Sequence, residues 1–287
     1  MLSRLFVLMQ YLLPKYLLTA LVYRLARVNV PTVKDALIRG FLKLYDVNLD
    51  EVRGQVPGDF RTFNDFFIRE LQDGARPVDT DPRAIVSPAD GTLSQAGALR
   101  GNRILQAKGI DYTLEDLLAA DLDTAGALAG GTFATIYLAP YNYHRVHAPV
   151  DGELVAAHYV PGDLFSVNGK TAAHVPGLFS RNERLNLHFR TAFGPIVVVL
   201  VGALNVGSIS TPWSGEIRPR RRGVVESLDL SVAPCDVRKG DLLGWFNMGS
   251  TVILLLPPDT CSWRENFAAG VTTVMGTAIG ELAAPAG

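Results

Sequence analysis

A glycine-serine pair, Gly249-Ser250, stands directly before the β-branched and aliphatic run Thr251–Leu256. This order predicts a turn that leads into a buried strand. Glycine leaves its own carbonyl sterically open and tolerates strained backbone conformations. The Ser250 hydroxyl could therefore attack the Gly249 carbonyl if a base removes its proton. Most Gly-Ser pairs are ordinary turns, so the other reactive residues of the chain must decide between the two interpretations.

Two of the five histidines, His144 and His147, lie three residues apart in the proline-bounded segment Pro140–Pro149. Polar loops on a rigid scaffold are a common place for reactive groups, and histidine exchanges protons near neutral pH. The pair therefore indicates acid-base chemistry. His-x-x-His is also a metal-ligand spacing, but no cysteine or obvious carboxylate completes a ligand set nearby. We expect no metal.

Two aspartates, Asp90 and Asp151, each occupy a Pro-x-Asp-Gly turn. An aspartate in a turn usually bonds its own backbone, and that is the default for both. A carboxylate could instead orient a histidine, and serine, histidine and aspartate form catalytic sets in any chain order. A serine hydrolase is therefore one alternative, although Ser250 lacks the G-x-S-x-G context of many hydrolases.

One turn pattern, Pro-x-x-Gly-x-apolar, occurs in Ser87–Leu93, Ala148–Leu154 and Thr211–Ile217. Each copy predicts a proline-led turn whose glycine opens a strand. The recurrence predicts a β-rich catalytic core of hairpins or a flattened barrel, and with the N-terminal helices an α+β fold. The strand candidates are Thr132–Leu138, Gly152–Tyr159, Leu185–Arg190, Ile196–Ala203 and Thr251–Leu256.

Two short helices are predicted from their start signals. Thr113 and Asp116 resemble a capping box that begins a helix running to about Ala120. Thr62 is a candidate N-cap for a helix that carries Phe63, Phe66 and Phe67 on one face. We expect that aromatic face to be core and not part of a site.

The bulk composition excludes several classes of protein. At 287 residues the chain can form one large domain, or one domain with an appendage. A net charge of −1 gives no general attraction to nucleic acid. The only cysteines, Cys235 and Cys261, form no C-x-x-C unit, so neither a disulfide framework nor a thiolate zinc site is expected.

Residues 1–47 differ from the rest of the chain. Their apolar runs, Leu5–Leu13 and Tyr16–Tyr23, are shorter than the ~20 residues needed to span a bilayer. This segment contains seven basic and two acidic residues. Basic apolar helices of this kind lie in the headgroup plane of anionic membranes. We predict a membrane-associating helical region at residues 1–60 and a catalytic domain at residues 61–287; a helical cap packed on that domain is the alternative.

Four stretches together resemble phosphatidylserine decarboxylase of the bacterial, membrane-associated kind. They are the turn that holds Asp90, the segment Pro140–Pro149, Leu164–Asn168 and Met248–Thr251. The basic N-terminus and the stretch from Thr62 through Arg69 to Arg76-Pro77 extend the resemblance over nearly the whole chain. Methionine stands at position 248 where the family more often has leucine, which is a volume-conserving exchange.

The resemblance implies a proenzyme that cuts itself between Gly249 and Ser250. Ser250 would attack the Gly249 carbonyl, with His147 as base and Asp90 orienting His147. The resulting ester would eliminate, and residue 250 would become a pyruvoyl group. The products would be a β chain of residues 1–249 and an α chain of residues 250–287.

The resemblance also implies the reaction: phosphatidylserine would lose CO2 through a Schiff base on the pyruvoyl group and become phosphatidylethanolamine. Loss of CO2 from an amino acid requires an electron sink that no ordinary side chain supplies. His144 is the implied proton donor, and Phe165 and Ser166 would border the headgroup pocket. The implied setting is the cytoplasmic face of the cell membrane, with peripheral attachment to anionic lipid and a homo-oligomer among the expected assemblies.

Two features leave other interpretations open. The run of Arg218, Arg220, Arg221 and Arg222 could bind phosphate, or it could be a solvated loop. The Pro-x-Asp-Gly turns, with Lys239 before Gly240-Asp241, also resemble domains that carry biotin, lipoate or a phosphoryl group. A carrier domain would remain a single chain, and a serine hydrolase would remain uncut.

Overall fold

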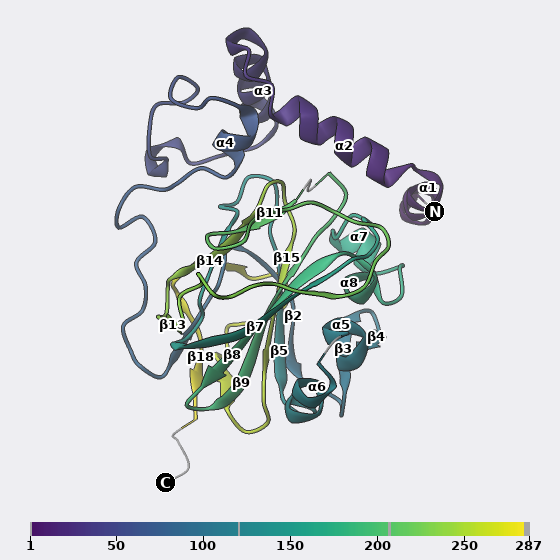
Figure 1. The fold of residues 1–287 in the computed structure, drawn as a ribbon, viewed down its shortest axis with the longest axis vertical. Coiled ribbons are helices and arrows are strands. Elements are labelled where there is room, and N and C mark those ends of the chain that lie inside the picture. The colour runs from purple at the N-terminus through teal and green to yellow at the C-terminus, as the bar shows by residue number, and fades with distance from the viewer. Residues whose placement is uncertain (1, 120, 206–207, 284–287) are drawn as a thin grey trace.

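A computed structural model describes residues 2–119, 121–205 and 208–283 of the protein. Three helices form one end of it: α1 (Leu2–Leu12), α2 (Lys15–Ala26) and α3 (Pro31–Leu44). The β-rich body lies beneath them, and β18 (Ala278–Leu282) lies on the side of that body away from the helices (Figure 1). No helix in these described ranges is long and apolar enough to cross a bilayer.

One antiparallel sheet of nine strands forms most of the body, and the strand from the apolar run after Gly249-Ser250 lies near its middle. That strand, β15 (Thr251–Leu256), pairs with β9 (Gly194–Val201) on one side and β5 (Thr132–Tyr137) on the other. Every residue of β15 is buried, as its continuous apolar sequence predicts. The remaining strands of this sheet are β12 (Glu226–Ser227), β7 (Gly152–Val160), β8 (Arg184–Thr191), β2 (Gly91–Ala98), β17 (Thr272–Thr273) and β13 (Asp236–Val237).

Three smaller sheets complete the body. The sheet next to the reactive residues has the order β11 (Gly215–Ile217), β10 (Ile209–Thr211), β14 (Leu242–Phe246) and β6 (Arg145–His147). The others are β1 (Ala84–Val86), β18 (Ala278–Leu282) and β16 (Cys261–Trp263), and the hairpin β3 (Arg103–Ala107) and β4 (Ile110–Thr113). The predicted α+β class is confirmed, and within the described ranges the β-rich core consists of open antiparallel sheets without a closed barrel.

The repeated Pro-x-x-Gly turn has the predicted role, because β2, β7 and β11 begin at Gly91, Gly152 and Gly215. Gly91 is required by close packing as well: a Cβ there would lie 2.5 Å from the Tyr137 carbonyl oxygen. The five predicted strands are all present, within two residues at each end. A short sequence pattern therefore marks where three strands of two different sheets begin.

The short helices also follow their start signals. Thr62 and Asp65 make a reciprocal capping box at α4 (Phe63–Phe67). The Thr113 hydroxyl caps α5 (Leu114–Leu118), and the expected end at Ala120 lies outside the described residues. The other short helices are η1 (Leu49–Glu51), α6 (Leu122–Leu128), α7 (Gly169–Ala172) and α8 (Leu178–Arg181).

Two hydrophobic clusters hold the fold together. The larger lies within the β-rich body, and the smaller joins α3 to α4. Phe63, Phe66 and Phe67 belong to the smaller one, so the predicted aromatic core face is confirmed. Phe67 departs from the expectation that this face takes no part in a site, because it lines a cavity with Gly249 and its ring packs on His144. This cluster contains residues on both sides of the boundary predicted after residue 60, and the division into domains at that point remains a prediction. Its members are Ala26, Ile38, Val47, Val52, Phe60, Phe63, Phe66 and Phe67.

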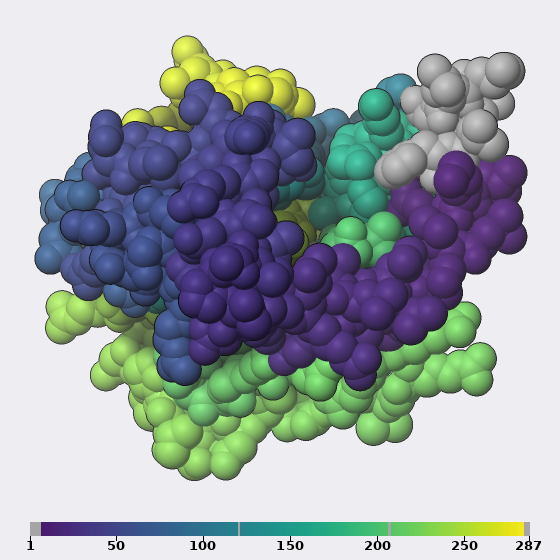
Figure 2. Space-filling view, turned by 90° about the horizontal axis from the view of Figure 1, so that it is seen from above, coloured from purple at the N-terminus to yellow at the C-terminus, as the bar shows by residue number. Residues whose placement is uncertain are grey.

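Helices α1 and α2 are attached to the body by polar contacts. The Gln10 amide bonds the Ser166 main chain and the Thr171 hydroxyl. The Lys15 ammonium lies 3.3 Å from an Asp163 carboxylate oxygen, and Arg27 pairs with Glu216. Figure 2, which views this end of the molecule, shows α2 and α3 running across the body beside the green segment that follows β10.

Candidate active site

The Gly249-Ser250 peptide lies between the end of β14 and the start of β15. The Ser250 side chain is fully buried, and its hydroxyl has no hydrogen-bond partner among the described residues. Its carbonyl accepts a bond of 2.8 Å from the Leu138 N–H, which fixes the backbone at the entry to the central strand. A buried hydroxyl without a partner costs free energy, so its retention here is typical of a functional group.

Gly249 is packed directly against His144. A Cβ on residue 249 would lie 3.1 Å from His144 Nε2 and 3.3 Å from the Leu138 carbonyl oxygen. Any other residue at this position would push the imidazole or the backbone aside. The glycine thus serves two purposes: it exposes its carbonyl, and it lets the imidazole approach the peptide.

His144 is completely buried, and neither ring nitrogen has a hydrogen-bond partner among the described residues. Its ring lies 4.2 Å, centroid to centroid, from the Phe67 ring. Burial, followed by the nearby Arg69 guanidinium, lowers the pKa of His144 to about 3. In the uncut chain the imidazole is therefore neutral at physiological pH.

Arg69 holds the loop that carries His144. Its guanidinium donates to the carbonyl oxygens of Tyr141 at 2.9 Å and Asn142 at 3.4 Å. The side chain is buried, and this burial lowers its pKa to about 10, so it stays charged. Sequence reasoning found Arg69 only as part of the family resemblance, because its contacts join segments more than 70 residues apart.

Asn247, two residues before Gly249, is also fixed by side chains. Asn247 donates to the hydroxyl oxygens of Ser208 at 2.7 Å and Ser210 at 2.9 Å. Its own amide oxygen accepts a bond of 3.2 Å from Asn64 in α4. This buried network ties the loop before Ser250 to both β10 and the N-terminal helices. No pattern in the sequence indicated it.

A cavity of about 300 Å³ opens beside Gly249. Ser166, one of the two residues expected to border the substrate, lines it. Phe165 points elsewhere: it is fully buried, with the Lys15 ammonium 3.6 Å from its ring centroid. The other lining residues are aromatic, apolar or amide-bearing: Phe41, Tyr45, Phe67, Tyr137, Leu138, Pro140, Val167, Asn168, Ala203, Leu204, Asn205 and Met248.

Asp90 and His147 lie near one another without a hydrogen bond between their side chains in the uncut chain. Asp90 accepts from the Arg76 guanidinium and from the Met275 N–H at 2.8 Å. His147 Nδ1 lies 2.8 Å from the Gly240 carbonyl oxygen, and Nε2 lies 3.2 Å from the Tyr143 hydroxyl. Burial lowers the pKa of His147.

The backbone nevertheless connects these two residues, because the His147 N–H donates to the carbonyl of Pro88, in the turn that holds Asp90. His147 lines a separate cavity with Tyr143 and Arg76, and Gly249 is not part of it. Of the predicted residues, the structure therefore gathers Gly249, Ser250 and His144 at one point and places Asp90 with His147 at another. No metal-binding cluster of histidine, cysteine or carboxylate residues occurs within the described ranges.

Acid should destabilise the uncut chain through His144. Its pKa is about 3 when folded and ordinarily 6.5, so below pH 6.5 the unfolded chain binds a proton that the folded chain refuses. In a Ser250→Ala background we expect His144 to make the free energy of unfolding about 2 kcal/mol lower at pH 5 than at pH 7. Urea unfolding at both pH values measures this difference. The control is Ser250→Ala/His144→Gln, and an identical pH dependence in both proteins would contradict the argument.

The buried Ser250 hydroxyl and the neutral His144 imidazole both lie beside Gly249, an arrangement typical of an active site. Comparison with known sequences specifies the class. The family model described as phosphatidylserine decarboxylase matches residues 63–281, and a second, described as PSD, matches residues 5–46. The chain therefore belongs to the phosphatidylserine decarboxylase family, and it is a carboxy-lyase.

Several curated relatives match over nearly their full length. Proteins of Methylococcus capsulatus and Vibrio vulnificus are each 46% identical, over 96% and 94% of this chain and 96% and 95% of their own. One from Saccharophagus degradans is 44% identical over 97% of both chains. Each is named phosphatidylserine decarboxylase proenzyme. The carrier and hydrolase alternatives are thereby excluded as the primary function.

Proposed function

We propose that this chain cuts itself between Gly249 and Ser250 and then converts phosphatidylserine to phosphatidylethanolamine and CO2. One observation carries the proposal: the Ser250 hydroxyl is buried without a partner among the described residues, next to a glycine against which the His144 imidazole packs. The word proenzyme in the names of the relatives supports it, because it describes a chain that matures after synthesis.

The cleavage can be written with the chain's own atoms. Ser250 Oγ adds to the Gly249 carbonyl carbon, the C–N bond breaks, and the hydroxyl proton ends on the freed amine, which gives an ester. Loss of the Cα proton of residue 250 then breaks its Cβ–Oγ bond, releasing Gly249 as a carboxylate and leaving dehydroalanine. Water replaces the nitrogen, ammonia departs, and residue 250 becomes a pyruvoyl group.

The surroundings of residue 250 fit such a group. The site is closed to solvent at Ser250, opens at Gly249 into the 300 Å³ cavity, and holds no lysine among that cavity's lining residues to compete for a ketone. The pyruvoyl ketone supplies the chemistry that side chains lack, because it condenses with the substrate amine and takes up the electron pair left by CO2. Ser166 and Asn168 line the cavity and could bind the polar headgroup.

We assign the two histidines to different steps. His147, with Asp90 as its carboxylate, is proposed to accept the Ser250 proton in self-cleavage, and His144 to return a proton to the substrate carbon in decarboxylation. For the first step Asp90 must exchange its Arg76 contact for His147. The position of His144 beside Gly249 supports its role in turnover, since residue 250 is the point where the substrate is held.

Intact mass spectrometry of the purified protein tests the self-cleavage directly. We expect two fragments, one of residues 1–249 and one of residues 250–287. The smaller should resist Edman chemistry and react with a hydrazine reagent, because it begins with a ketone and not an amine. Active protein that consists only of the full-length chain would overturn the proposal.

We further propose that the enzyme rests on the surface of the cell membrane through α1 and α2. Leu17, Leu21 and Leu25 follow one another at helical spacing and are about half exposed or more, and Leu12 in α1 is 80% exposed. Exposed leucines on one helix face, with Arg24 beside them, are typical of a helix that lies in the headgroup plane. The substrate headgroup lies at the same depth.

Charge on this leucine face should prevent membrane binding. We expect Leu17→Glu/Leu21→Glu to reduce cosedimentation of the full chain with phosphatidylglycerol vesicles at least about tenfold, since each buried leucine contributes about 1.5–3 kcal/mol. Leu122→Glu is the matched control, because Leu122 is 65% exposed on α6, far from the N-terminal helices (Figure 1). Equal loss in both proteins would show that the leucine face is not the docking surface.

A further inference from the structure

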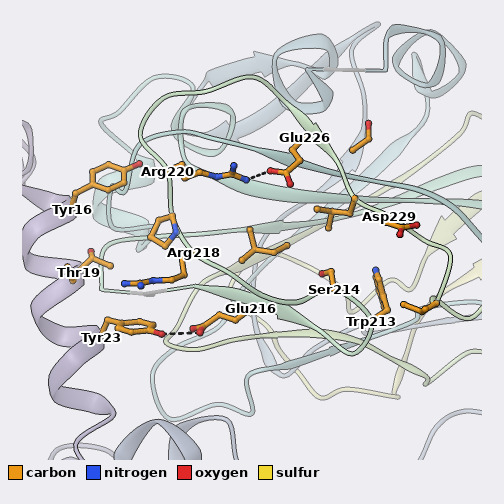
Figure 3. A pocket seen from close by; sticks show the side chains of 16 residues that line it. Tyr16, Thr19, Tyr23, Trp213, Ser214, Glu216, Arg218, Arg220, Glu226 and Asp229 are labelled. Atoms are coloured by element: carbon orange, nitrogen blue, oxygen red, sulfur yellow. Dashed lines mark hydrogen bonds and ion pairs between the residues drawn. The ribbon is translucent and has the colours of Figure 1, made fainter.

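A second and larger cavity, of about 890 Å³, lies between α2 and the segment 213–232 (Figure 3). One wall is the inward face of α2, with Tyr16, Thr19 and Tyr23; the other includes Trp213 and Arg218. None of its lining residues lines the cavity beside Gly249. It is therefore separate from the site where the reaction is proposed, and nothing in the decarboxylation requires it.

The carboxylates of this second cavity are already engaged. Glu216 accepts from Arg27 at 2.7 Å and from the Tyr23 hydroxyl at 3.0 Å. Glu226 pairs with Arg220, a contact drawn in Figure 3. The Asp229 carboxylate accepts from the main chain and hydroxyl of Ser231 and lies at the end of the cavity away from α2 (Figure 3). At the α2 end, the Glu216 carboxylate is thus already neutralised by Arg27.

The guanidinium of Arg218 lies against Tyr23 of α2. It lies 4.4 Å from the Tyr23 ring centroid, and Arg27 lies 3.7 Å from the same centroid. Within the described residues no carboxylate lies within ion-pair distance of Arg218, and the Glu216 carboxylate of the same wall is already paired with Arg27. Figure 3 shows Arg218 beside α2 at this end of the cavity. The uncompensated charge favours an anion there.

The rest of the cavity is large and includes apolar surface. Trp213 lies at the end away from α2 (Figure 3), and its indole N–H is buried without an acceptor among the described residues. Leu228 and Val232 add apolar surface to the wall, and Val232 is 74% exposed. A free phosphate ion would fill a small part of 890 Å³ and would leave this apolar surface in water.

We propose that this cavity binds an anionic phospholipid other than the reacting one, with its phosphate on Arg218 and its glycerol and first acyl carbons against Leu228 and Val232. The Arg218 end provides charge-assisted donors suited to phosphate oxygens. The position agrees with this occupant, because α2 forms one wall of the cavity while its opposite face carries the exposed leucines. The leaflet that supplies substrate would also supply this ligand.

Calorimetric titration of the full-length chain with dihexanoyl phosphatidylglycerol, kept below its micelle concentration, tests the site. We expect Arg218→Gln to weaken binding at least tenfold and Arg218→Lys to retain part of it, since charged hydrogen bonds of this kind are worth about 1.5–3 kcal/mol. The matched control is Arg222→Gln, which removes an exposed arginine of the same loop that does not line the cavity and should bind like the unaltered protein.

Two further titrations distinguish a lipid phosphate from a free phosphate. Glycerol 3-phosphate and inorganic phosphate should each bind at least tenfold more weakly than the short-chain lipid, and equal affinity would overturn the lipid assignment. Unchanged lipid binding by Arg218→Gln would overturn the site itself, because lipid held only in the cavity beside Gly249 does not touch Arg218. The measurement requires no turnover, so it stands or fails independently of the pyruvoyl proposal.

Discussion

Ser250→Ala should yield one uncut chain of 287 residues without measurable decarboxylase activity. The change removes the only atom proposed to attack the Gly249 carbonyl, and with it the source of the ketone. Removal of a nucleophile from a self-contained catalytic set lowers its rate by about 10³-fold or more, and here the lost product is the cofactor itself. Denaturing mass spectrometry and CO2 release from phosphatidylserine measure the two effects.

A neighbouring hydroxyl provides the control for this experiment. Thr251 is also fully buried with no hydrogen-bond partner among the described residues, and it is the next residue in the chain. Thr251→Val removes that hydroxyl at nearly constant volume and should still cut and turn over. Cleavage that persists in Ser250→Ala, or that disappears in Thr251→Val, would contradict the assignment of Ser250 as the attacking residue.

The two histidine variants should separate the two steps. His147→Ala should remain uncut. His144→Ala should cut itself, yet turn over phosphatidylserine about 10²–10⁴-fold more slowly, which is the usual contribution of a positioned proton donor. Fragment masses and CO2 release report the steps independently. His174→Ala is the control, since His174 is only partly buried and its side chain bonds only the nearby Lys170 carbonyl among the described residues.

The structure makes this a demanding test, because His144 and not His147 approaches Gly249 in the uncut chain. If His144→Ala also stays uncut, one imidazole serves both steps and the proposed division is wrong. If His147→Ala cuts normally, the hydrogen bonds of His147 to Tyr143 and Gly240 are its whole role. Either result can be read directly from the fragment masses.

Local signals accounted for much of the fold. Thr251–Leu256 is a strand with the predicted ends, because a continuous apolar run after a glycine leaves little choice of structure. The capping box at Thr62 and the glycines that open β2, β7 and β11 were predictable for the same reason: each depends on the conformational preference of one or two residues. The open form of the sheets depends on distant strand pairing, which the sequence does not encode locally.

The site was predictable as a set of residue types and less so as a geometry. Gly249 and Ser166 line the same cavity, and His144 packs against Gly249 beside the buried Ser250. That Asp90 would be held by Arg76 could not be deduced, because a turn aspartate can bond its backbone, a histidine or an arginine with equal ease. The contact of Phe67 with His144 could not be deduced either, since the sequence of a core aromatic residue does not indicate which distant side chain it will contact.

The position of β15 between β9 and β5 determines what becomes of the two products. The proposed cut lies immediately before β15. This strand pairs with β9 over Thr251–Leu255 and with β5 over its full length. Strand β15 of the short fragment would thus stay hydrogen-bonded between two strands of the larger fragment, with all six of its residues buried. Maturation would alter a covalent connection while the two pieces continue to behave as one particle, separable only by unfolding both.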